Sequence, residues 1–181
     1  MQKILIVLLF SIAFISGSNG ENILKDNFTN KNEWTYIADN VMGGVSKGGV
    51  EFNSFDSDAH ALLRGNVSTK NNGGFIQIRR ELKNIDLSKA KSIRLYARGN
   101  NEKYFIFLRT TGTILPWQYY SHEFTVNEEY NEFIMPIKDF KKSGSLLAKQ
   151  INPKKITSIG IVAYGRDHYA ELYVKELEFL E

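Results

Sequence analysis

Residues 92–98 read SIRLYAR and residues 104–108 read YFIFL, and these two stretches decide the fold class. In the first stretch Ile93, Leu95 and Ala97 alternate with arginine and tyrosine, a period of two that predicts a strand with one buried face. The second stretch is apolar at every position, which predicts a central strand covered on both faces. Both stretches therefore indicate β-structure.

The same alternation recurs on either side of these stretches. Turn signals separate the alternating runs at residues 71–74, 99–101, 112, 143–145, 152–153 and 165. Short strands at a spacing of roughly ten residues favour an all-β fold, a sandwich or a jelly roll. The alternating apolar positions are Ile76 and Ile78; Phe133, Met135 and Ile137; Ile159, Ile161 and Ala163; and Leu172, Val174, Leu177 and Phe179.

Two features depart from regular alternation. The apolar phase slips by one position between Val174 and Leu177, which predicts a β-bulge near Lys175-Glu176. The helical candidates are single turns over residues 137–142 and 146–150.

The first 20 residues have the three-part pattern of a secretory signal peptide. Lys3 supplies a positive start, residues 4–15 are apolar apart from Ser11, and residues 16–20 offer small residues for cleavage. The apolar run is shorter than the about 20 residues that a bilayer span needs, so a cleaved signal is favoured over a retained membrane anchor. We therefore expect an exported protein, periplasmic or secreted, whose residues 21–181 form a single jelly-roll domain with no membrane span after cleavage.

The composition limits the classes of partner. The 12 Phe, 9 Tyr and 2 Trp are typical of a folded core rather than a disordered chain. The formal net charge is +3 and both signs are interspersed, so the sequence offers no basic footprint for nucleic acid. Cysteine is absent, and the scattered His60, His122 and His168 lack the spacing of a metal site.

The most unusual segment is residues 39–46, which read DNVMGGVS. Adjacent glycines allow positive φ or a close backbone approach, and Asp39 and Asn40 can fix a loop by bonding local amides. A ligand-facing loop and a rigid corner between strands both fit this pattern. On the first interpretation the candidate ligand- or partner-binding residues are Asp39, Asn40, Met42 and Ser46.

Residues 71–75 read NNGGF, and Asn-Gly is a strong hairpin signal, so we expect a hairpin turn here. Asn72 joins the candidate binding residues. If Gly43 or Gly74 has a positive φ, valine at that position would be strained.

Residues 116–122 read PWQYYSH and place large aromatic side chains next to polar ones. In a strand Trp117 and Tyr119 share one face and Tyr120 points to the other, so one of these sets faces outward. An outward set would form a platform for a sugar or a protein partner, whereas an aromatic strand in the core is the alternative. Trp117, Tyr119 and Tyr120 are therefore candidate binding residues.

No pattern marks a catalytic residue. Residues 44–48 match the G-x-S-x-G string, but that motif needs a strand, a turn and then a helix, and a strand is expected after it. Nothing singles out the pair of facing carboxylates that glycoside hydrolysis needs. We expect no cofactor; a structural Ca²⁺ is the one weak metal candidate, if Asp26 and Glu178 approach each other.

Residues 39–46 followed by residues 71–75 resemble the complex I intermediate-associated protein 30 family, with support from residues 115–120, 133–140 and 156–161. The resemblance implies a galactose-binding-like jelly roll. For relatives it also implies a chaperone-like role, without known catalysis, in assembling mitochondrial NADH:ubiquinone oxidoreductase. The secretory signal departs from that picture, because it would deliver the chain outside the cytoplasmic membrane and not into a matrix.

The leading hypothesis is a non-catalytic exported module that binds an envelope or secreted protein partner, as an assembly or chaperone-like factor. The alternative is a carbohydrate-binding jelly-roll module that binds a glycan. Trp117, Tyr119 and Tyr120, together with outward-facing arginines at positions 79, 94 and 98, favour this alternative.

Overall fold

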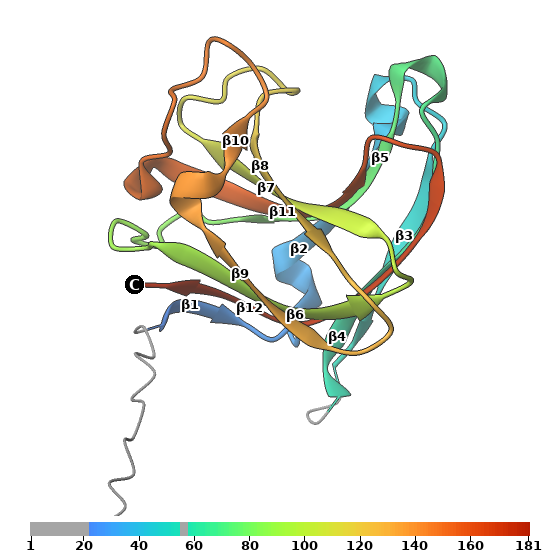
Figure 1. Cartoon of the computed structure of the whole chain (residues 1–181), viewed down its shortest axis with the longest axis horizontal. Helices are drawn as coiled ribbons and strands as arrows, with labels where there is room; N and C mark the ends of the chain where they lie inside the picture. Colours follow the sequence, from blue (N-terminus) through green and yellow to red (C-terminus); the bar gives the residue numbers. More distant parts are fainter. Residues whose placement is uncertain (1–21, 55–57) are drawn as a thin grey trace, which may run out of the picture.

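A computed structural model describes residues 22–54 and 58–181 and contains two antiparallel sheets that face each other (Figure 1). Sheet A has the order β3 (Lys47–Asn53), β4 (His60–Val67), β12 (His168–Leu180), β6 (Ser92–Gly99) and β9 (Asn131–Pro136), and β1 (Asn22–Asp26) also pairs with β12. Sheet B has the order β10 (Lys141–Lys142), β8 (Tyr120–Thr125), β7 (Lys103–Thr110), β11 (Ile156–Tyr164), β5 (Phe75–Glu81) and β2 (Trp34–Ala38).

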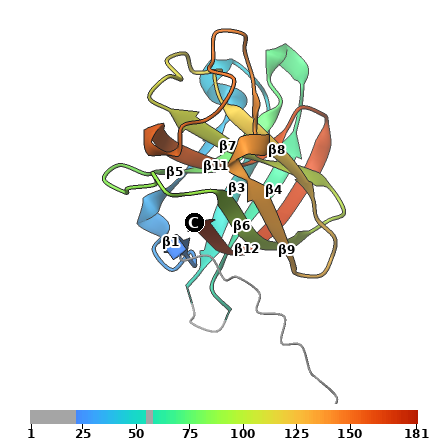
Figure 2. The same cartoon turned by 60° about the vertical axis from the view of Figure 1, so that its left-hand side comes forward.

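The two layers are separate in the rotated view. Strands β1, β12, β6 and β9 lie in the lower layer of Figure 2, and β8, β7 and β11 lie in the upper layer. Their facing sides enclose one hydrophobic core. This arrangement confirms the expected all-β, galactose-binding-like jelly-roll sandwich.

The alternation predicted for the core is confirmed. Ile93, Leu95 and Ala97 on β6 are fully buried, because a period of two puts them all on the side of sheet A that faces sheet B. β7 lies in the middle of sheet B, as its apolar run predicts. Phe105 and Phe107, which point away from the core, are only half-buried, so the outer side of β7 is a partly open surface rather than a second core.

The predicted bulge and one of the two helical turns are also confirmed. The pairing of β12 with β6 shifts register between Val174 and Glu176, which accounts for the change of apolar phase. η5 (Ile137–Asp139) is a short 3-10 turn, whereas residues 146–150 form bends and turns without a helix. Other 3-10 turns of the described residues are η1 (Lys31–Glu33), η2 (Asp39–Met42), η4 (Lys70–Asn72) and η6 (Pro153–Lys155).

The expected hairpin at residues 71–75 is wrong. These residues connect β4 in sheet A to β5 in sheet B, so the flanking strands do not pair with each other. The Asn and Gly residues serve a crossing between sheets instead: Asn71 and Asn72 both have φ of 58° and Gly74 has φ of 128°. The sequence correctly indicated a turn at these residues, but it did not indicate that the strands on either side belong to different sheets.

The two carboxylates considered for Ca²⁺ lie on opposite faces of β1 and β12. In the ladder Lys25 is opposite Glu178 and Asp26 is opposite Leu177, and successive residues of a strand alternate between faces. Asp26 accepts hydrogen bonds from Trp34 and Arg80, while Glu178 pairs with Lys25 and Arg94. Each carboxylate is therefore neutralised by protein cations, and the described residues hold no cluster of three metal-ligating side chains.

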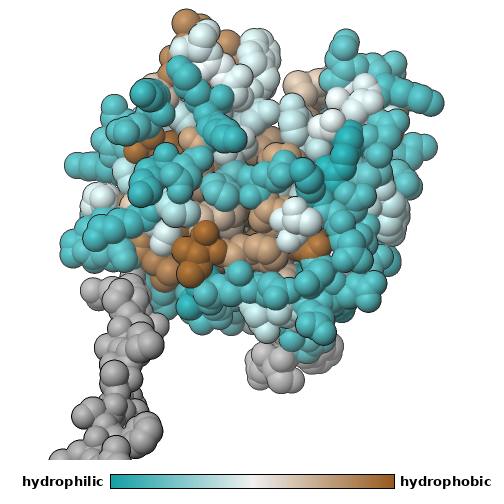
Figure 3. Space-filling view, viewed as in Figure 1, coloured by the Kyte–Doolittle hydropathy of each residue, from teal (hydrophilic) through white to brown (hydrophobic). Residues whose placement is uncertain are grey.

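The predicted signal peptide lies outside the described residues. Among the described residues, none of the helices has the length and apolar character needed to cross a membrane. Figure 3 shows a largely hydrophilic surface on one face, with hydrophobic surface near the middle of the view, around β9 and β6, and smaller hydrophobic spots at the top. Ile114, Leu115 and Leu146 are among the exposed apolar side chains of the chain.

Candidate ligand-binding cleft

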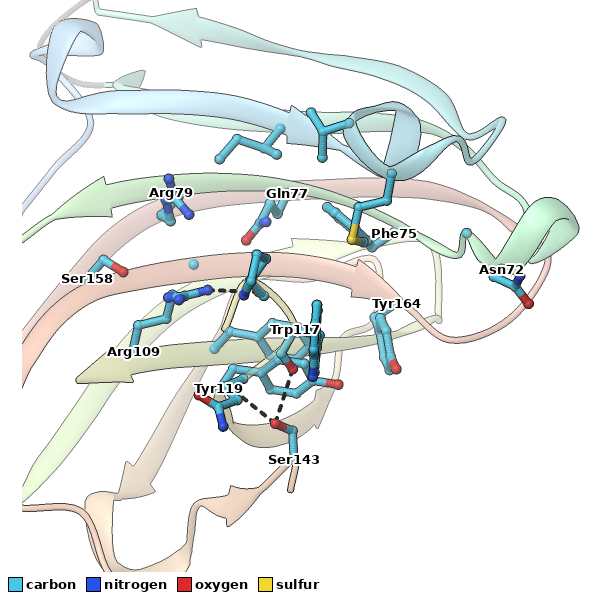
Figure 4. A pocket seen from close by; sticks show the side chains of 18 residues that line it. Asn72, Phe75, Gln77, Arg79, Arg109, Trp117, Tyr119, Ser143, Ser158 and Tyr164 are labelled. Atoms are coloured by element: carbon cyan, nitrogen blue, oxygen red, sulfur yellow. Dashed lines mark hydrogen bonds between the residues drawn. The ribbon is translucent and has the colours of Figure 1, made fainter. Parts of the chain in front are cut away.

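A cleft of about 740 Å³ lies on the outer side of sheet B, across β5, β11 and β7 (Figure 4). Alternation along each strand places its lining residues there. On β5, Ile76 and Ile78 are fully buried in the core, so Phe75, Gln77 and Arg79 point outward into the cleft. The rule that fills the core of the sandwich therefore also selects the side chains of the cleft.

The floor of the cleft is low because the central strand contributes small residues. In the ladder Gly160 of β11 lies between Arg79 of β5 and Phe107 of β7. Ser158 lies in the same way beside Arg109. Strands β5 and β7 carry larger side chains, so they form the sides of a trough that runs along β11.

One end of the trough is aromatic. The rings of Phe107 and Tyr119 stack with centroids 3.8 Å apart and an angle of 8° between planes. Tyr164 presents its ring to both, with centroids 5.5 Å and 6.1 Å away. Burial, followed by a hydrogen bond with Tyr164, raises the pKa of the Tyr119 phenol, so this end is uncharged at neutral pH.

A loop between β7 and β8 forms one rim of the cleft, and Arg109 holds it. The guanidinium donates hydrogen bonds to the carbonyl oxygens of Thr113, Leu115 and Pro116 at 2.8–3.1 Å. The Ser143 hydroxyl donates to the Trp117 carbonyl and accepts from the Tyr119 N–H. These contacts fix the backbone on both sides of Trp117, whose side chain remains 62% exposed at the rim.

The opposite rim consists of η2 and η4, and a buried carboxylate joins them. Asp39 Oδ2 accepts hydrogen bonds from the Ser46 hydroxyl at 2.5 Å and the Gly74 N–H at 2.6 Å, and Oδ1 accepts from the Ser46 N–H at 3.0 Å. A longer bond comes from the N–H of Phe75. Burial alone would raise the pKa of Asp39, but these hydrogen bonds outweigh it and hold the pKa below its usual value.

The glycine pairs Gly43-Gly44 and Gly73-Gly74 lie on either side of the Asp39 carboxylate, and the two members of each pair have different roles. Gly43 and Gly74 have φ of 87° and 128°, which non-glycine residues rarely adopt. A Cβ on Gly44 or on Gly73 would instead collide with the side chain of Asp39. One glycine of each pair therefore turns the chain, and the other lets the backbone approach the carboxylate.

The structure brings half of the predicted binding residues together in the cleft. Met42 and Asn72 lie on one rim, and Trp117 and Tyr119 lie on the other. The other four predicted residues do not line the cleft. Asp39 and Ser46 are fully buried and hold the rim in place. Asn40 donates a hydrogen bond to the Gly44 carbonyl, and the buried Tyr120 donates one to the Ala148 carbonyl.

Several lining residues were absent from the sequence-based set. They are Ile37, Val41, Gly73, Phe75, Gln77, Arg79, Phe107, Arg109, Pro116, Gln118, Ser143, Ser158, Gly160 and Tyr164. Arg79 had been expected to face outward, though not as a site residue. The signal for Phe107 was present, because an apolar residue on the outward side of a strand needs a cover or a ligand.

The lining residues in the described part of the chain include no Asp, Glu or His. Glycoside hydrolysis normally uses two carboxylates that flank the scissile bond, and the lining does not supply them. Ser46 of the G-x-S-x-G string is fully buried and leads into β3 rather than a helix. The geometry of the cleft suits binding of a ligand.

Taken together, the fold and the cleft define a galactose-binding-like jelly roll with a cleft on the outer side of one sheet. The family model for complex I intermediate-associated protein 30 (CIA30) matches residues 24–173. The chain therefore belongs to the CIA30 family, which confirms the resemblance seen in its glycine-rich segments. No curated protein sequence matches the chain.

Solved structures share the fold at low sequence identity. A family 11 carbohydrate-binding module from Clostridium thermocellum, in complex with a β-1,3-1,4-mixed-linked tetrasaccharide, has a TM-score of 0.71 and 14% identity, covering 91% of this chain and 97% of that one. A family 11 carbohydrate-binding module of the cellulosomal cellulase Lic26A-Cel5E of Clostridium thermocellum has the same score and identity, covering 92% of this chain and 97% of that one. An exo-β-agarase has a TM-score of 0.54 and 7% identity, covering 90% of this chain and 25% of that one.

Proposed function

We propose that the chain is a non-catalytic carbohydrate-binding module that holds a glycan in the cleft on sheet B. The observation that carries the proposal is a cleft with aromatic rings at one end and hydrogen-bonding side chains along its side and rim. Sugars present both an apolar face of C–H groups and a ring of hydroxyls. A site for them therefore combines aromatic surface with polar groups that fix orientation.

The cleft offers both kinds of contact. Trp117 and Tyr164 supply exposed aromatic surface, and Gln77 and Asn72 supply amides that can donate to and accept from hydroxyls. The cleft reaches the surface, because exposed side chains such as Trp117 and Tyr164 line it, so a chain of several sugar units can lie across it. The two carbohydrate-binding modules of similar fold add support to this proposal.

Isothermal titration of the protein with a panel of soluble polysaccharides tests the proposal. We expect at least one to bind, and Trp117→Ala to weaken that binding on the order of tenfold or more. Stacking on an aromatic ring contributes about 1–3 kcal/mol for a nucleic-acid base, and we expect a similar contribution from the apolar face of a sugar. Tyr169→Ala is the matched control, since Tyr169 is 46% exposed but lies on β12 of sheet A. Failure of the whole panel to bind would overturn the proposal.

A protein partner is the second candidate, and the exposed apolar rim favours it. Val41 is 74% exposed and Met42 is 51% exposed, and exposed apolar side chains next to a cleft are typical of interaction sites. The family name refers to association with complex I intermediates. Under this candidate a protein co-purifies with the chain from the host, and the Val41→Ser and Met42→Ser variants no longer co-purify it. Neither wild type nor Trp117→Ala would then bind any polysaccharide in the titrations.

We also propose export of the chain, on the signal-peptide pattern of residues 1–20. Export would bring a glycan-binding module to cell-envelope or extracellular polysaccharide. Fractionation of host cells, with detection of a mature chain that begins near residue 21, tests this localisation; recovery of the full-length chain from the cytosol would contradict it.

A further inference from the structure

The charged side chains that line the cleft are both cationic. In the described part of the chain they are Arg79 on β5 and Arg109 on β7, and no acidic side chain lines the cleft with them. A neutral polysaccharide needs no such excess of positive charge. The excess is local, because the chain as a whole carries a net charge of only +3 with both signs interspersed.

The charge of Arg109 has no carboxylate partner among the described residues. Its Nη1 and Nη2 donate to the carbonyl oxygens of Thr113, Leu115 and Pro116. Carbonyl groups satisfy the hydrogen bonds of a guanidinium, but they carry no net charge and so leave its positive charge uncompensated. Arg109 therefore projects a positive field into the cleft while it anchors the rim.

Arg79 has one acidic neighbour, and the contact is loose. Its Nε lies 3.4 Å from Glu81 Oε1, in a pair whose side chains are 34% and 50% exposed. Exposed ion pairs of this kind are weak. The two terminal nitrogens of Arg79 have no hydrogen-bond partner among the described residues, so they are available to a ligand.

The two arginines act on the same space. β11 separates β5 from β7 and contributes only Ser158 and Gly160 between them, so no bulky side chain stands between the guanidinium groups (Figure 4). Burial and then the charge of Arg79 lower the pKa of Arg109, and Glu81 raises it by less. The mutual repulsion is thus larger than the compensation by Glu81, and an anion placed between the arginines would relieve it.

From these observations we infer that the ligand of the cleft is an acidic glycan whose carboxylate or sulfate group is bound between Arg79 and Arg109. This inference rests on the proposed carbohydrate-binding function and names its ligand class. Arg79 donates hydrogen bonds from its terminal nitrogens, a geometry suited to the paired oxygens of an acidic group. The aromatic end at Tyr119 and Tyr164 takes the apolar face of a neighbouring sugar unit.

Matched polymers test the inference. The full chain is titrated at low and high salt with polygalacturonate and its fully methyl-esterified form, and with dextran sulfate and dextran. We expect one acidic polymer to bind on the order of tenfold to a hundredfold more tightly than its neutral counterpart, since hydrogen bonds to charged groups contribute more than neutral ones. The difference should shrink as salt rises.

Arg79→Gln should abolish the preference for the acidic polymer, and Arg79→Lys should retain part of it. Arg64→Gln is the matched control, because it removes one positive charge from sheet A, where Arg64 pairs with Glu51. Preference for polygalacturonate assigns a carboxylate ligand, and preference for dextran sulfate assigns a sulfate ligand. Either supports the inference.

Three outcomes would overturn it. If Arg64→Gln reduces the preference as much as Arg79→Gln does, the attraction belongs to the net charge of the protein and not to the cleft. If a neutral polymer binds as tightly as its acidic form, the carbohydrate-binding function is supported, but the inference that the ligand is an acidic glycan is wrong. If no polymer of any kind binds, both the function and its ligand class fail.

Discussion

The backbone N–H of Gly74 donates a 2.6 Å hydrogen bond to Oδ2 of Asp39, 35 positions earlier in the chain. Gly74 immediately precedes β5, and Asp39 begins η2. The bond therefore ties the segment that carries Met42 to the segment that carries Asn72, and the two together make one rim of the cleft. A fully buried residue thereby determines where the rim lies.

Asp39→Asn should lower the free energy of unfolding by on the order of 2–3 kcal/mol. The amide nitrogen that replaces one carboxylate oxygen cannot accept a hydrogen bond, so a buried donor at Ser46 or Gly74 is left unpaired. Chemical denaturation at neutral pH measures the loss. Asp139→Asn, at an exposed position of η5, is the control; equal losses in both variants would contradict a specific role for Asp39.

The stabilisation by Asp39 should also depend on pH. Its pKa in the folded protein is lowered relative to about 3.9 in an unfolded chain. Its contribution is therefore complete above pH values near 4 and is lost as pH falls through the folded-state pKa. The difference in unfolding free energy between wild type and Asp39→Asn should narrow on acidification below about pH 4. A constant difference down to pH 2 would show that the folded protein does not hold the pKa of Asp39 below its value in the unfolded chain.

Gly43→Val and Gly74→Val should each destabilise the fold by about 1–3 kcal/mol, because a β-branched residue is strained at positive φ. Gly43 and Gly144 form a matched pair: a Cβ at either position meets no atom within 4 Å, but of the two only Gly43 has a positive φ. Thermal unfolding of Gly43→Val and Gly144→Val therefore separates backbone strain from crowding. Equal melting temperatures would mean that strain at Gly43 is negligible.

The alternation of apolar residues was sufficient to predict the all-β fold class and which side of a strand faces the core. It placed Ile93 and Leu95 in the core and located the bulge near Lys175. It did not predict which strands pair, because alternation gives the face of a residue but not the sheet to which its strand belongs. β6 and β7 follow each other in sequence and lie in different sheets, and the same ambiguity produced the mistaken hairpin at residues 71–75.

The cleft was less predictable than the core for a related reason. Trp117 could be found from its local sequence, since it lies among turn and polar residues. Arg79, Arg109 and Gly160 come from three strands that are far apart in the chain, and only their register reveals that they share one surface. Asp39 was equally ambiguous, because an acidic residue in a glycine-rich loop can bind a ligand or bind backbone amides, and two of its donors, the N–H groups of Gly74 and Phe75, lie outside the loop.

Asp26→Ala should destabilise the protein by about 3–5 kcal/mol, which is typical when one partner of a buried ion pair is removed. Asp26 accepts hydrogen bonds from the Trp34 indole N–H and the Phe28 N–H, both at 2.8 Å, and also pairs with Arg80. Glu51→Ala, which breaks an exposed pair with Arg64, is the control and should cost no more than about 1 kcal/mol. Denaturant titration compares the two, and similar small losses would contradict the prediction.

Gly160→Val should separate binding from folding. An added Cβ at Gly160 would lie 2.8 Å from Oε1 of Gln77, at the end of a flexible side chain, and 3.5 Å from Val162, so the strand can accommodate it. Valine is favoured in strands and glycine weakens them. We therefore expect the melting temperature to stay the same or to rise slightly.

Binding should respond in the opposite direction. The isopropyl group would fill the floor of the cleft between Arg79 and Phe107 and displace the Gln77 amide, so the polysaccharide that wild type binds should be lost. Gly49→Val is the matched control, because Gly49 lies on β3 of sheet A and a Cβ there meets no atom within 4 Å. Titration and thermal unfolding of both variants complete the test. If Gly160→Val binds the polysaccharide as wild type does, the ligand does not reach the floor of sheet B, and the site lies elsewhere on the sandwich.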